Sequence, residues 1–356
     1  MRSSGGQHFV GLDHVRALAA FMVVAWHFDH GFTGSPVPFN QAPALGLLDE
    51  GHAGVALFMV LSGYLFAKLI DGRRIDFGAF IWNRALRLLP LLLIVILAVG
   101  ILGGRNNPFD YLRLISSGLV LPTLPNGGWS ITAEFHFYVI LPFLLWLTAR
   151  WKWAPLALVA VALSLRIGIA SISEVQYVSY HTIIGRLDQF VLGIFFFHQR
   201  VTGRQAAAAL SAILVFYATF DRLGGFYNLS VDWPWVFIPT VEGLAFGALI
   251  AWYDAHPLRW PIMRFVEKAG EYSYSIYLLH VFFVLAAARF VNEHVMTLGS
   301  LYVALPWALL FFSAMVVIGH FSFKFVESPA LRFRKPYIVK AETVPEAPPV
   351  ALLAGP

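Results

Sequence analysis

The sequence predicts an all-α integral membrane protein, a bundle of about ten transmembrane helices with the N- and C-termini in the cytoplasm. The first observation is composition: of the 356 residues, 58% are hydrophobic and only 13% are charged, whereas a soluble domain carries about 25% charged residues. The second is a series of apolar runs about as long as a bilayer-spanning helix. The third is the uneven distribution of Lys and Arg between those runs.

Ten segments have the apolar character of a membrane-crossing helix, which needs about 20 residues. They are expected at residues 10–30, 53–70, 86–103, 131–150, 154–171, 183–199, 206–220, 234–252, 274–292 and 301–323. No small-residue cleavage site follows the first run, so we expect a retained helix rather than a signal peptide. Residues 1–340 are expected to form a single transmembrane domain, and the proline- and alanine-rich residues 341–356 a disordered cytoplasmic tail.

Basic residues favour one of the two sets of loops. If the N-terminus lies inside, 18 of the 25 Lys and Arg residues fall in loops on that side and five on the other, with Arg16 and Arg166 inside helices. Cytoplasmic loops carry this excess, so both termini are expected in the cytoplasm. Because the bias also accounts for the basic pI of about 9.4, we expect membrane lipids, and no nucleic acid, as partners.

Two ionisable residues interrupt the first apolar run. Arg16 and His27 are eleven positions apart, so on a helix they lie within about 20° of one direction and roughly 16 Å apart along the axis. Ionisable side chains inside a membrane are costly and mark functional sites. Arg16 could instead pair with Asp13 on the same face. His27 could be a satisfied core residue, or a general base, since the ordinary pKa of an imidazole lies near neutrality.

A carboxylate begins the fourth run, in "GGWSITAEFHFYVILPF". Glu134 is expected at about the depth of His27, where it could face inward and hold the imidazole in one tautomer. The alternative is structural, because an acidic residue near a helix N-terminus is favoured by the helix dipole and Ser130 could cap the helix. The sequence leaves open whether Glu134 and His27 meet.

A basic stretch, "AFIWNRALRLLP", leads into the third run. Arg84 and Arg87 are at i, i+3 and therefore share a helix face. Guanidinium groups pair bidentately with phosphate, so the two could form a phosphate clamp. Anchoring of the loop by the positive-inside rule is the alternative.

Cysteine is absent, which excludes a thiolate nucleophile, a disulfide and a zinc–thiolate site. His27, His30 and His52 suggest a metal site only weakly, because neither an H-x-x-x-H spacing nor a carboxylate-rich pattern accompanies them. We therefore expect no metal.

Three further motifs have local interpretations. Gly63, in "GVALFMVLSGYLF", is expected in a small-residue helix that packs closely. In "GRLDQFVLG", Arg186 and Asp188 could form a local pair, and "YSYSIYLLH" puts Tyr277 and His280 on one helix face.

Together these motifs resemble the bacterial acyltransferase-3 family of integral-membrane O-acyltransferases. The resemblance covers residues 10–334 and includes seven motifs in order, the remaining ones being "GLDHVRALAAFMVVAWH" and "FVESPALR". It implies ten transmembrane helices in the bacterial inner membrane and transfer of an acyl group, usually acetyl, from cytoplasmic acyl-CoA. The implied acceptors are hydroxyls of surface polysaccharides, glycolipids or small metabolites. One departure is Asn83, where the family often has a basic residue. A second is the lack of an additional extracytoplasmic domain, which implies a single-domain member.

Carried over by motif, the resemblance implies that His27 and Glu134 are catalytic and that Arg16, Arg84 and Arg87 bind the donor, acetyl-CoA. His27 would act as general base on the acceptor hydroxyl, with Glu134 orienting or relaying, in a direct transfer. An acyl-enzyme is less favoured, since no serine lies in an evident nucleophile motif. The competing function is a transporter or flippase for a saccharide or lipid-linked sugar, which would use the same intramembrane polar residues but often shows internal repeats that this sequence lacks.

Overall fold

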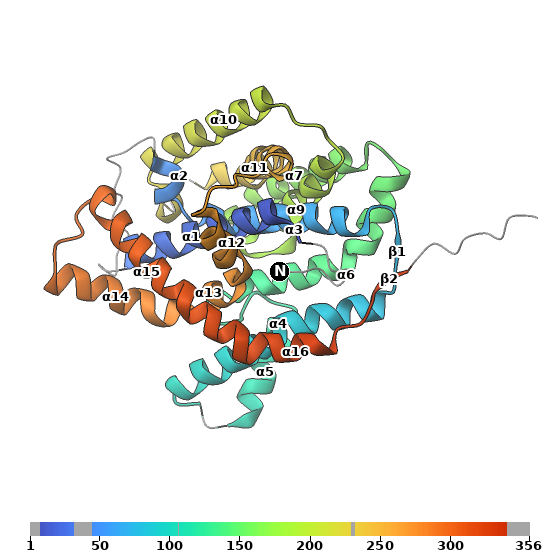
Figure 1. The fold of residues 1–356 in the computed structure, drawn as a ribbon. Coiled ribbons are helices and arrows are strands. Elements are labelled where there is room, and N and C mark those ends of the chain that lie inside the picture. Colours follow the sequence, from blue (N-terminus) through green and yellow to red (C-terminus); the bar gives the residue numbers. More distant parts are fainter. Residues whose placement is uncertain (1–7, 32–44, 106, 229–231, 340–356) are drawn as a thin grey trace, which may run out of the picture.

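The computed structural model describes residues 8–31, 45–105, 107–228 and 232–339, and these are helical almost throughout (Figure 1). The α-helices are α1 (Val10–Gly31), α2 (Gly46–Asp49), α3 (Ala53–Ile70), α4 (Phe77–Leu102), α5 (Pro108–Gly118), α6 (Trp129–Arg150), α7 (Ala154–Ala170), α8 (Val175–His181), α9 (Ile183–Phe197), α10 (Gly203–Arg222), α11 (Ile238–Ala255), α12 (Met263–Glu271), α13 (Ser273–Leu279), α14 (Val281–His294), α15 (Leu301–Ser322) and α16 (Ser328–Ala330). Two short strands, β1 (Arg74–Ile75) and β2 (Ile338–Val339), pair antiparallel. The predicted tail lies outside the described residues.

Each of the ten predicted runs coincides with helix. By length and hydropathy, four helices of the described chain could cross a membrane: α3, α4, α6 and the continuous segment that begins with α15, Leu301–Phe333. The number rises to five if α13 and α14 count as one bent span. The all-helical character is therefore confirmed and a multi-pass membrane protein is supported, while the count of ten spans and the orientation of the termini stay predictions.

Helix α4 begins nine residues before the predicted start at residue 86. The Asp76 side chain accepts a hydrogen bond from the Ala79 amide at 3.0 Å and so caps the helix. The predicted start was too late because polar residues in the first part of the helix interrupt the apolar run. Arg84 and Arg87 consequently lie on a formed helix, on adjacent turns of one face.

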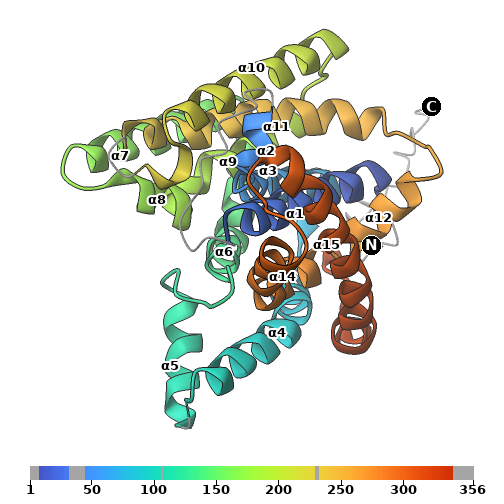
Figure 2. The same ribbon diagram turned by 90° about the vertical axis from the view of Figure 1, so that its left-hand side faces the viewer.

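Helix α3 is the central element and packs against α1, α9 and α11 (Figure 2). A Cβ atom at Gly63 would lie 2.0 Å from the carbonyl oxygen of Phe190, and one at Gly193 would lie 2.0 Å from that of Val60. Only glycine allows the backbones of α3 and α9 to approach this closely. The predicted close packing at Gly63 is confirmed.

The predicted helix at 274–292 is broken into α13 and α14, which meet at an angle of 66°. The break falls at His280, whose Nδ1 bonds the carbonyl oxygens of Ile276 at 3.2 Å and Tyr277 at 2.7 Å. A broken helix inside a membrane bundle is tolerated where the freed backbone groups find partners or line a cavity. The bend brings the end of α13 into the interior of the bundle.

The predicted local pair of Arg186 and Asp188 is wrong. Residues two positions apart point to different sides of a helix, and each finds a partner on another helix instead. Arg186 lies 3.5 Å from Glu242 of α11, and Asp188 lies 2.7 Å from Arg166 of α7. These buried ion pairs join α7, α9 and α11.

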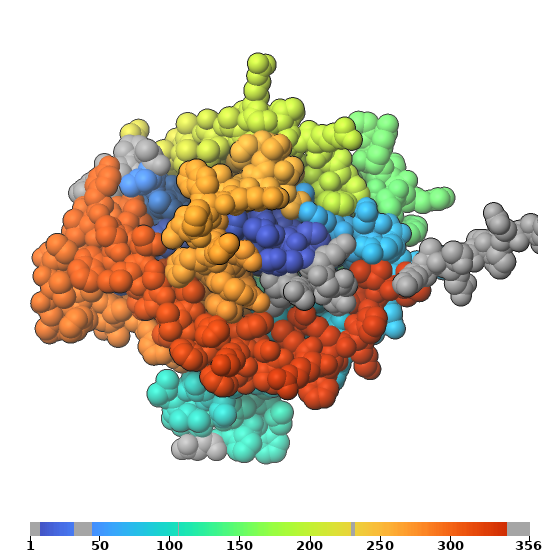
Figure 3. Space-filling model, in the orientation of Figure 1, coloured from blue at the N-terminus to red at the C-terminus, as the bar shows by residue number. Residues whose placement is uncertain are grey.

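The chain after α16 returns to the start of α4. The Asn83 side chain donates to the Lys335 carbonyl at 2.7 Å and accepts from the Lys335 amide at 2.9 Å. Strand β2 then pairs with β1 just before α4. In the space-filling view the red band across the lower face of the molecule is α15 and α16, and α5 projects below it (Figure 3).

Candidate active site

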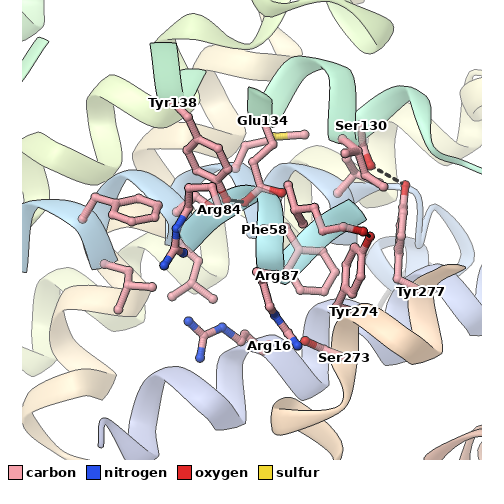
Figure 4. A pocket seen from close by; sticks show the side chains of 18 of the residues that line it. Arg16, Phe58, Arg84, Arg87, Ser130, Glu134, Tyr138, Ser273, Tyr274 and Tyr277 are labelled. Atoms are coloured by element: carbon pink, nitrogen blue, oxygen red, sulfur yellow. Dashed lines mark hydrogen bonds between the residues drawn. The ribbon is translucent and has the colours of Figure 1, made fainter. Parts of the chain in front are cut away.

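A cavity among α1, α3, α4, α6, α12 and α13 gathers four of the five predicted site residues: Arg16, Arg84, Arg87 and Glu134 (Figure 4). We call it the arginine cavity. Its empty volume is about 970 Å³, including the part that opens to solvent. The sequence separates these residues by up to 118 positions, and the bundle places them around one space.

Arg84 is the arginine of this cavity that forms no ion pair within the described chain. Its guanidinium lies over the ring of Phe66, 5.2 Å from the centroid, and 5.9 Å from that of Tyr138. Its Nε is buried and has no hydrogen-bond partner. A half-buried cation without a carboxylate is suited to an anionic ligand.

The positive charge of Arg87 is already compensated by a carboxylate of the protein. Arg87 forms an ion pair with Glu327, which is fully buried and also accepts a hydrogen bond from Ser275. The Arg87 guanidinium lies 5.2 Å from the centroid of the Tyr274 ring. Arg87 therefore ties α4 to the end of the last long helix, in addition to lining the cavity.

Arg16 pairs with Asp13, as the structural alternative predicted. It lines the arginine cavity all the same, and the close-up shows it reaching in from α1 (Figure 4). The local pair and the cavity position are compatible, because the guanidinium has five donors.

Glu134 accepts hydrogen bonds from Tyr138 and, at 3.3 Å, from the Ser62 hydroxyl. The predicted Ser130 cap is wrong: Gly128 is the capping residue of α6 and no side chain caps the helix. The Ser130 hydroxyl donates instead to the Tyr277 hydroxyl at 2.9 Å. Glu134 is thus fixed inside the arginine cavity by its own helix and by α3.

His27 lies in a different, adjoining cavity. We call it the histidine cavity; it is lined by Val23, Trp26, His27, His52, Val55, Gly127, Trp129, Tyr180, His181, Phe226, Tyr277, His280 and Val281. No Asp, Glu, Lys or Arg is among these lining residues, which are mostly aromatic rings and imidazoles. The two cavities share Val55 and Tyr277.

The hydrogen bonds of His27 define its tautomer. Nδ1 lies 2.8 Å from the Val23 carbonyl oxygen, which can only accept, so Nδ1 carries the proton. Nδ1 also lies 3.3 Å from Nε2 of His280. In a neutral ring Nε2 then has the free lone pair, and within the described chain Nε2 of His27 makes no hydrogen bond. This is the atom that a general base uses.

The side chain that orients His27, beside the Val23 carbonyl, is His280, and the described structure contains no hydrogen bond between His27 and Glu134. Nδ1 of His280 donates to the carbonyls at the end of α13, so its Nε2 faces His27 as an acceptor. The sequence motif placed His280 near Tyr277, but nothing in it indicated a pairing with α1. That pairing depends on the bend between α13 and α14.

Arg334 is a further basic residue that the sequence analysis missed. It directly precedes Lys335, which the Asn83 amide holds against α4, and its Nε is buried without a partner. Burial, together with the positive charges of Arg84 and Arg87, lowers the pKa of Arg334 to about 10. Arg334 is therefore still a cation at neutral pH, and it lies close enough to Arg84 and Arg87 to feel their charge.

Known proteins share this sequence over most of its length. The profile of the acyltransferase domain matches residues 9–324. The exopolysaccharide production protein ExoZ of Rhizobium meliloti is 25% identical over 79% of this chain and 90% of its own length. Nodulation protein 10 of Rhizobium leguminosarum bv. viciae is 31% identical over 45% of this chain and 50% of its own.

A Staphylococcus aureus protein that bears the name O-acetyltransferase is 23% identical over 93% of this chain. The match spans only 60% of that relative's length. No solved structure matches. Because the domain profile covers nearly the whole bundle, including both cavities, the chain belongs to the acyltransferase-3 family and is an acyltransferase.

Proposed function

We propose that this acyltransferase moves an acetyl group from cytoplasmic acetyl-CoA to a hydroxyl of a saccharide, in an exported or cell-surface polysaccharide or glycolipid, across the bacterial inner membrane. The observation that carries the proposal is the pair of adjoining cavities. One is lined by three arginines, which suit a phosphorylated donor, and the other holds the free lone pair of His27 in an uncharged, aromatic surrounding.

Coenzyme A is held at its phosphates by Arg84 and Arg334, with Arg87 contributing less because Glu327 already compensates it. Asn83 adds no charge of its own, and its double hydrogen bond to Lys335 supports a role in positioning Arg334. The uncharged pantetheine arm extends past Arg16 into the arginine cavity. The charged nucleotide stays at the cytoplasmic surface, since losing its hydration inside the bilayer would be costly.

The transfer is direct. His27 Nε2 removes the proton from the acceptor hydroxyl as the oxygen attacks the thioester carbonyl carbon. The tetrahedral intermediate collapses, the C–S bond breaks, and the thiolate of coenzyme A takes up the proton. His280 keeps the lone pair of His27 directed at the acceptor. Glu134, bonded to Tyr138 and Ser62, positions the donor in the arginine cavity rather than the imidazole.

The acceptor is an uncharged sugar ring. Its apolar faces pack against Trp129 and Tyr180, which lie 4.7 Å apart between ring centroids. The names of relatives agree with this class, since ExoZ is an exopolysaccharide production protein. An acceptor with a carboxylate or phosphate at the reacting ring would find no cation among the residues that line the histidine cavity.

The test is release of coenzyme A thiol by the purified full chain in lipid nanodiscs. Acetyl-CoA and de-O-acetylated polysaccharide should together give thiol and acetylated polysaccharide in equal amounts, and His27→Ala should give neither. A matched variant, His294→Ala, removes an exposed imidazole at the end of α14 and should behave as wild type. Movement of the saccharide across the membrane of sealed vesicles that contain the full chain, without thiol release, would favour the transporter instead.

A further inference from the structure

The hydroxyl of Tyr277 lies at the junction of the two cavities. It accepts a hydrogen bond from Ser130, which lines the arginine cavity, and donates to the carbonyl of Gly127, which lines the histidine cavity, each at 2.9 Å. The close-up shows the Ser130–Tyr277 bond at the edge of the arginine cavity (Figure 4). Tyr277 itself is 8% exposed.

The Tyr277 ring contacts one ring from each cavity lining. Phe58, which lines the arginine cavity, meets it edge-on with ring centroids 6.1 Å apart, and the ring of His280, which lines the histidine cavity, also has its centroid 6.1 Å away. Val55 is the other residue common to both linings. Tyr277 and Val55 therefore belong to the wall that the two cavities share.

The sequence before α6 positions the backbone carbonyl that accepts a hydrogen bond from the Tyr277 hydroxyl. In "PNGGWS", Asn126 and Gly127 both have positive φ, 54° and 73°, a backbone turn that glycine adopts without strain. A Cβ atom at Gly127 would lie 3.2 Å from the Tyr277 hydroxyl oxygen. Glycine at this position thus lets the backbone come close enough for its carbonyl to accept from Tyr277.

We propose that Tyr277 makes the enzyme select the acceptor hydroxyl over water, by closing the passage between the arginine and histidine cavities until an acceptor is bound. This inference rests on the proposed function. If the passage stood open, water beside His27 would reach the thioester. Its oxygen would attack the carbonyl carbon, the C–S bond would break, and acetate and the free thiol of coenzyme A would leave. Active sites that exclude water suppress this side reaction.

The test compares thiol release without acceptor in wild type, Tyr277→Ala, Tyr277→Phe and Ser130→Ala. Tyr277→Ala removes the ring and should raise hydrolysis of acetyl-CoA at least about ten-fold, while transfer to polysaccharide falls. Tyr277→Phe and Ser130→Ala keep the ring and lose the hydroxyl contact, so each should raise hydrolysis by a smaller factor. Tyr302→Ala, a 61% exposed tyrosine on α15, is the control and should leave both reactions unchanged.

The additional hydrolysis should depend on His27, because the same base activates water. The double variant His27→Ala/Tyr277→Ala should therefore fall back to the wild-type hydrolysis rate. If Tyr277→Ala does not fold, as judged by its elution and melting temperature, the hydrolysis rates of Tyr277→Phe and Ser130→Ala test the inference instead. Hydrolysis within about two-fold of wild type in every folded variant would overturn the inference. If wild type does not transfer acetyl from acetyl-CoA at all, the proposed function itself is wrong.

Discussion

His27 and His280 lie 253 residues apart in the chain, and their facing nitrogens, Nδ1 and Nε2, are 3.3 Å apart. The Val23 carbonyl accepts from the same Nδ1 of His27, and the Tyr277 carbonyl accepts from Nδ1 of His280, the nitrogen that does not face His27. The pair therefore has one consistent proton arrangement when both rings are neutral, with the lone pair of His27 Nε2 free. The account makes this lone pair the base for acyl transfer.

Replacing His27 by alanine should abolish acetyl transfer without unfolding the protein. Loss of a general base costs typically about 10²–10⁴-fold in rate, roughly 3–5 kcal/mol of activation free energy. The measurement is acetyl-CoA-dependent acetylation by protein whose elution profile and melting temperature match wild type. Turnover close to wild type would remove His27 from the chemistry.

His280→Leu should lower kcat about ten-fold or more and leave the KM for acetyl-CoA unchanged. Leucine cannot accept from Nδ1 of His27, so the imidazole loses one of its two orienting contacts, while the arginine cavity is untouched. Steady-state kinetics at saturating acceptor would separate the two constants. A KM effect with normal kcat would instead place His280 in substrate binding.

Arg84 and Arg87 should behave differently, although both line the same cavity. Arg84→Ala should raise the KM for acetyl-CoA about ten-fold or more, because charge-assisted contacts to phosphate are worth roughly 1.5–3 kcal/mol. Arg87→Ala should chiefly destabilise the protein, by about 3–5 kcal/mol, because it leaves the buried Glu327 carboxylate unpaired. Kinetics and denaturation of both variants check this. Equal effects on KM and on stability would contradict the distinction.

The sequence was sufficient to place the ten helical runs and to single out Arg16, Arg84, Arg87 and Glu134, but not to show that these four residues line one cavity. Arg16, Arg84, Arg87 and Glu134 each occupy motifs, and they converge because α1, α4 and α6 surround the central helix α3. The spacing of eleven residues from Arg16 predicts the depth of His27 in the membrane. Depth alone did not reveal that Glu134, expected at a similar depth, lies in a separate cavity.

What sequence could not reveal depends on tertiary geometry. The apolar run at 274–292 contains no proline or glycine to indicate a break, so the bend at His280 and its contact with His27 were not predictable. From the sequence, Asn83 was interpreted only as the loss of a basic residue that the family often has at this position. In the structure its side-chain amide forms two hydrogen bonds with the backbone of Lys335. The pairing of Arg186 with Glu242 likewise depends on how α9 and α11 pack.

Asn83→Ala should weaken donor binding in the same direction as Arg334→Ala, by a smaller factor. Losing the two hydrogen bonds to Lys335 frees the segment that carries Arg334, whereas Arg334→Ala removes the charge itself. The KM for acetyl-CoA and its increase with salt should both change most in Arg334→Ala. Control variant Arg222→Ala, at the end of α10 and exposed, should leave the KM as it is. An unchanged KM for acetyl-CoA in Arg334→Ala would show that Arg334 does not bind the donor, and would leave only Arg16, Arg84 and Arg87 for that role.

Ser62→Ala distinguishes direct transfer from an acyl-enzyme. The Ser62 hydroxyl donates to Glu134 in the arginine cavity, so it is the serine best placed to be acylated. Direct transfer predicts that Ser62→Ala keeps activity within about ten-fold of wild type. Incubation of wild type with labelled acetyl-CoA, without acceptor, should leave no label on the denatured protein. Stable label on wild type that Ser62→Ala abolishes would establish an acyl-enzyme.

The central claim is that the acetyl group passes from one membrane face to the other while coenzyme A stays on the cytoplasmic side. The most direct measurement uses sealed, oriented vesicles that contain the full chain, with labelled acetyl-CoA enclosed on the cytoplasmic face. De-O-acetylated polysaccharide, too large and polar to cross, is supplied only on the opposite face. The account predicts labelled polysaccharide outside and free coenzyme A thiol inside, both lost in His27→Ala. Product that forms only when donor and acceptor share the cytoplasmic face would contradict it.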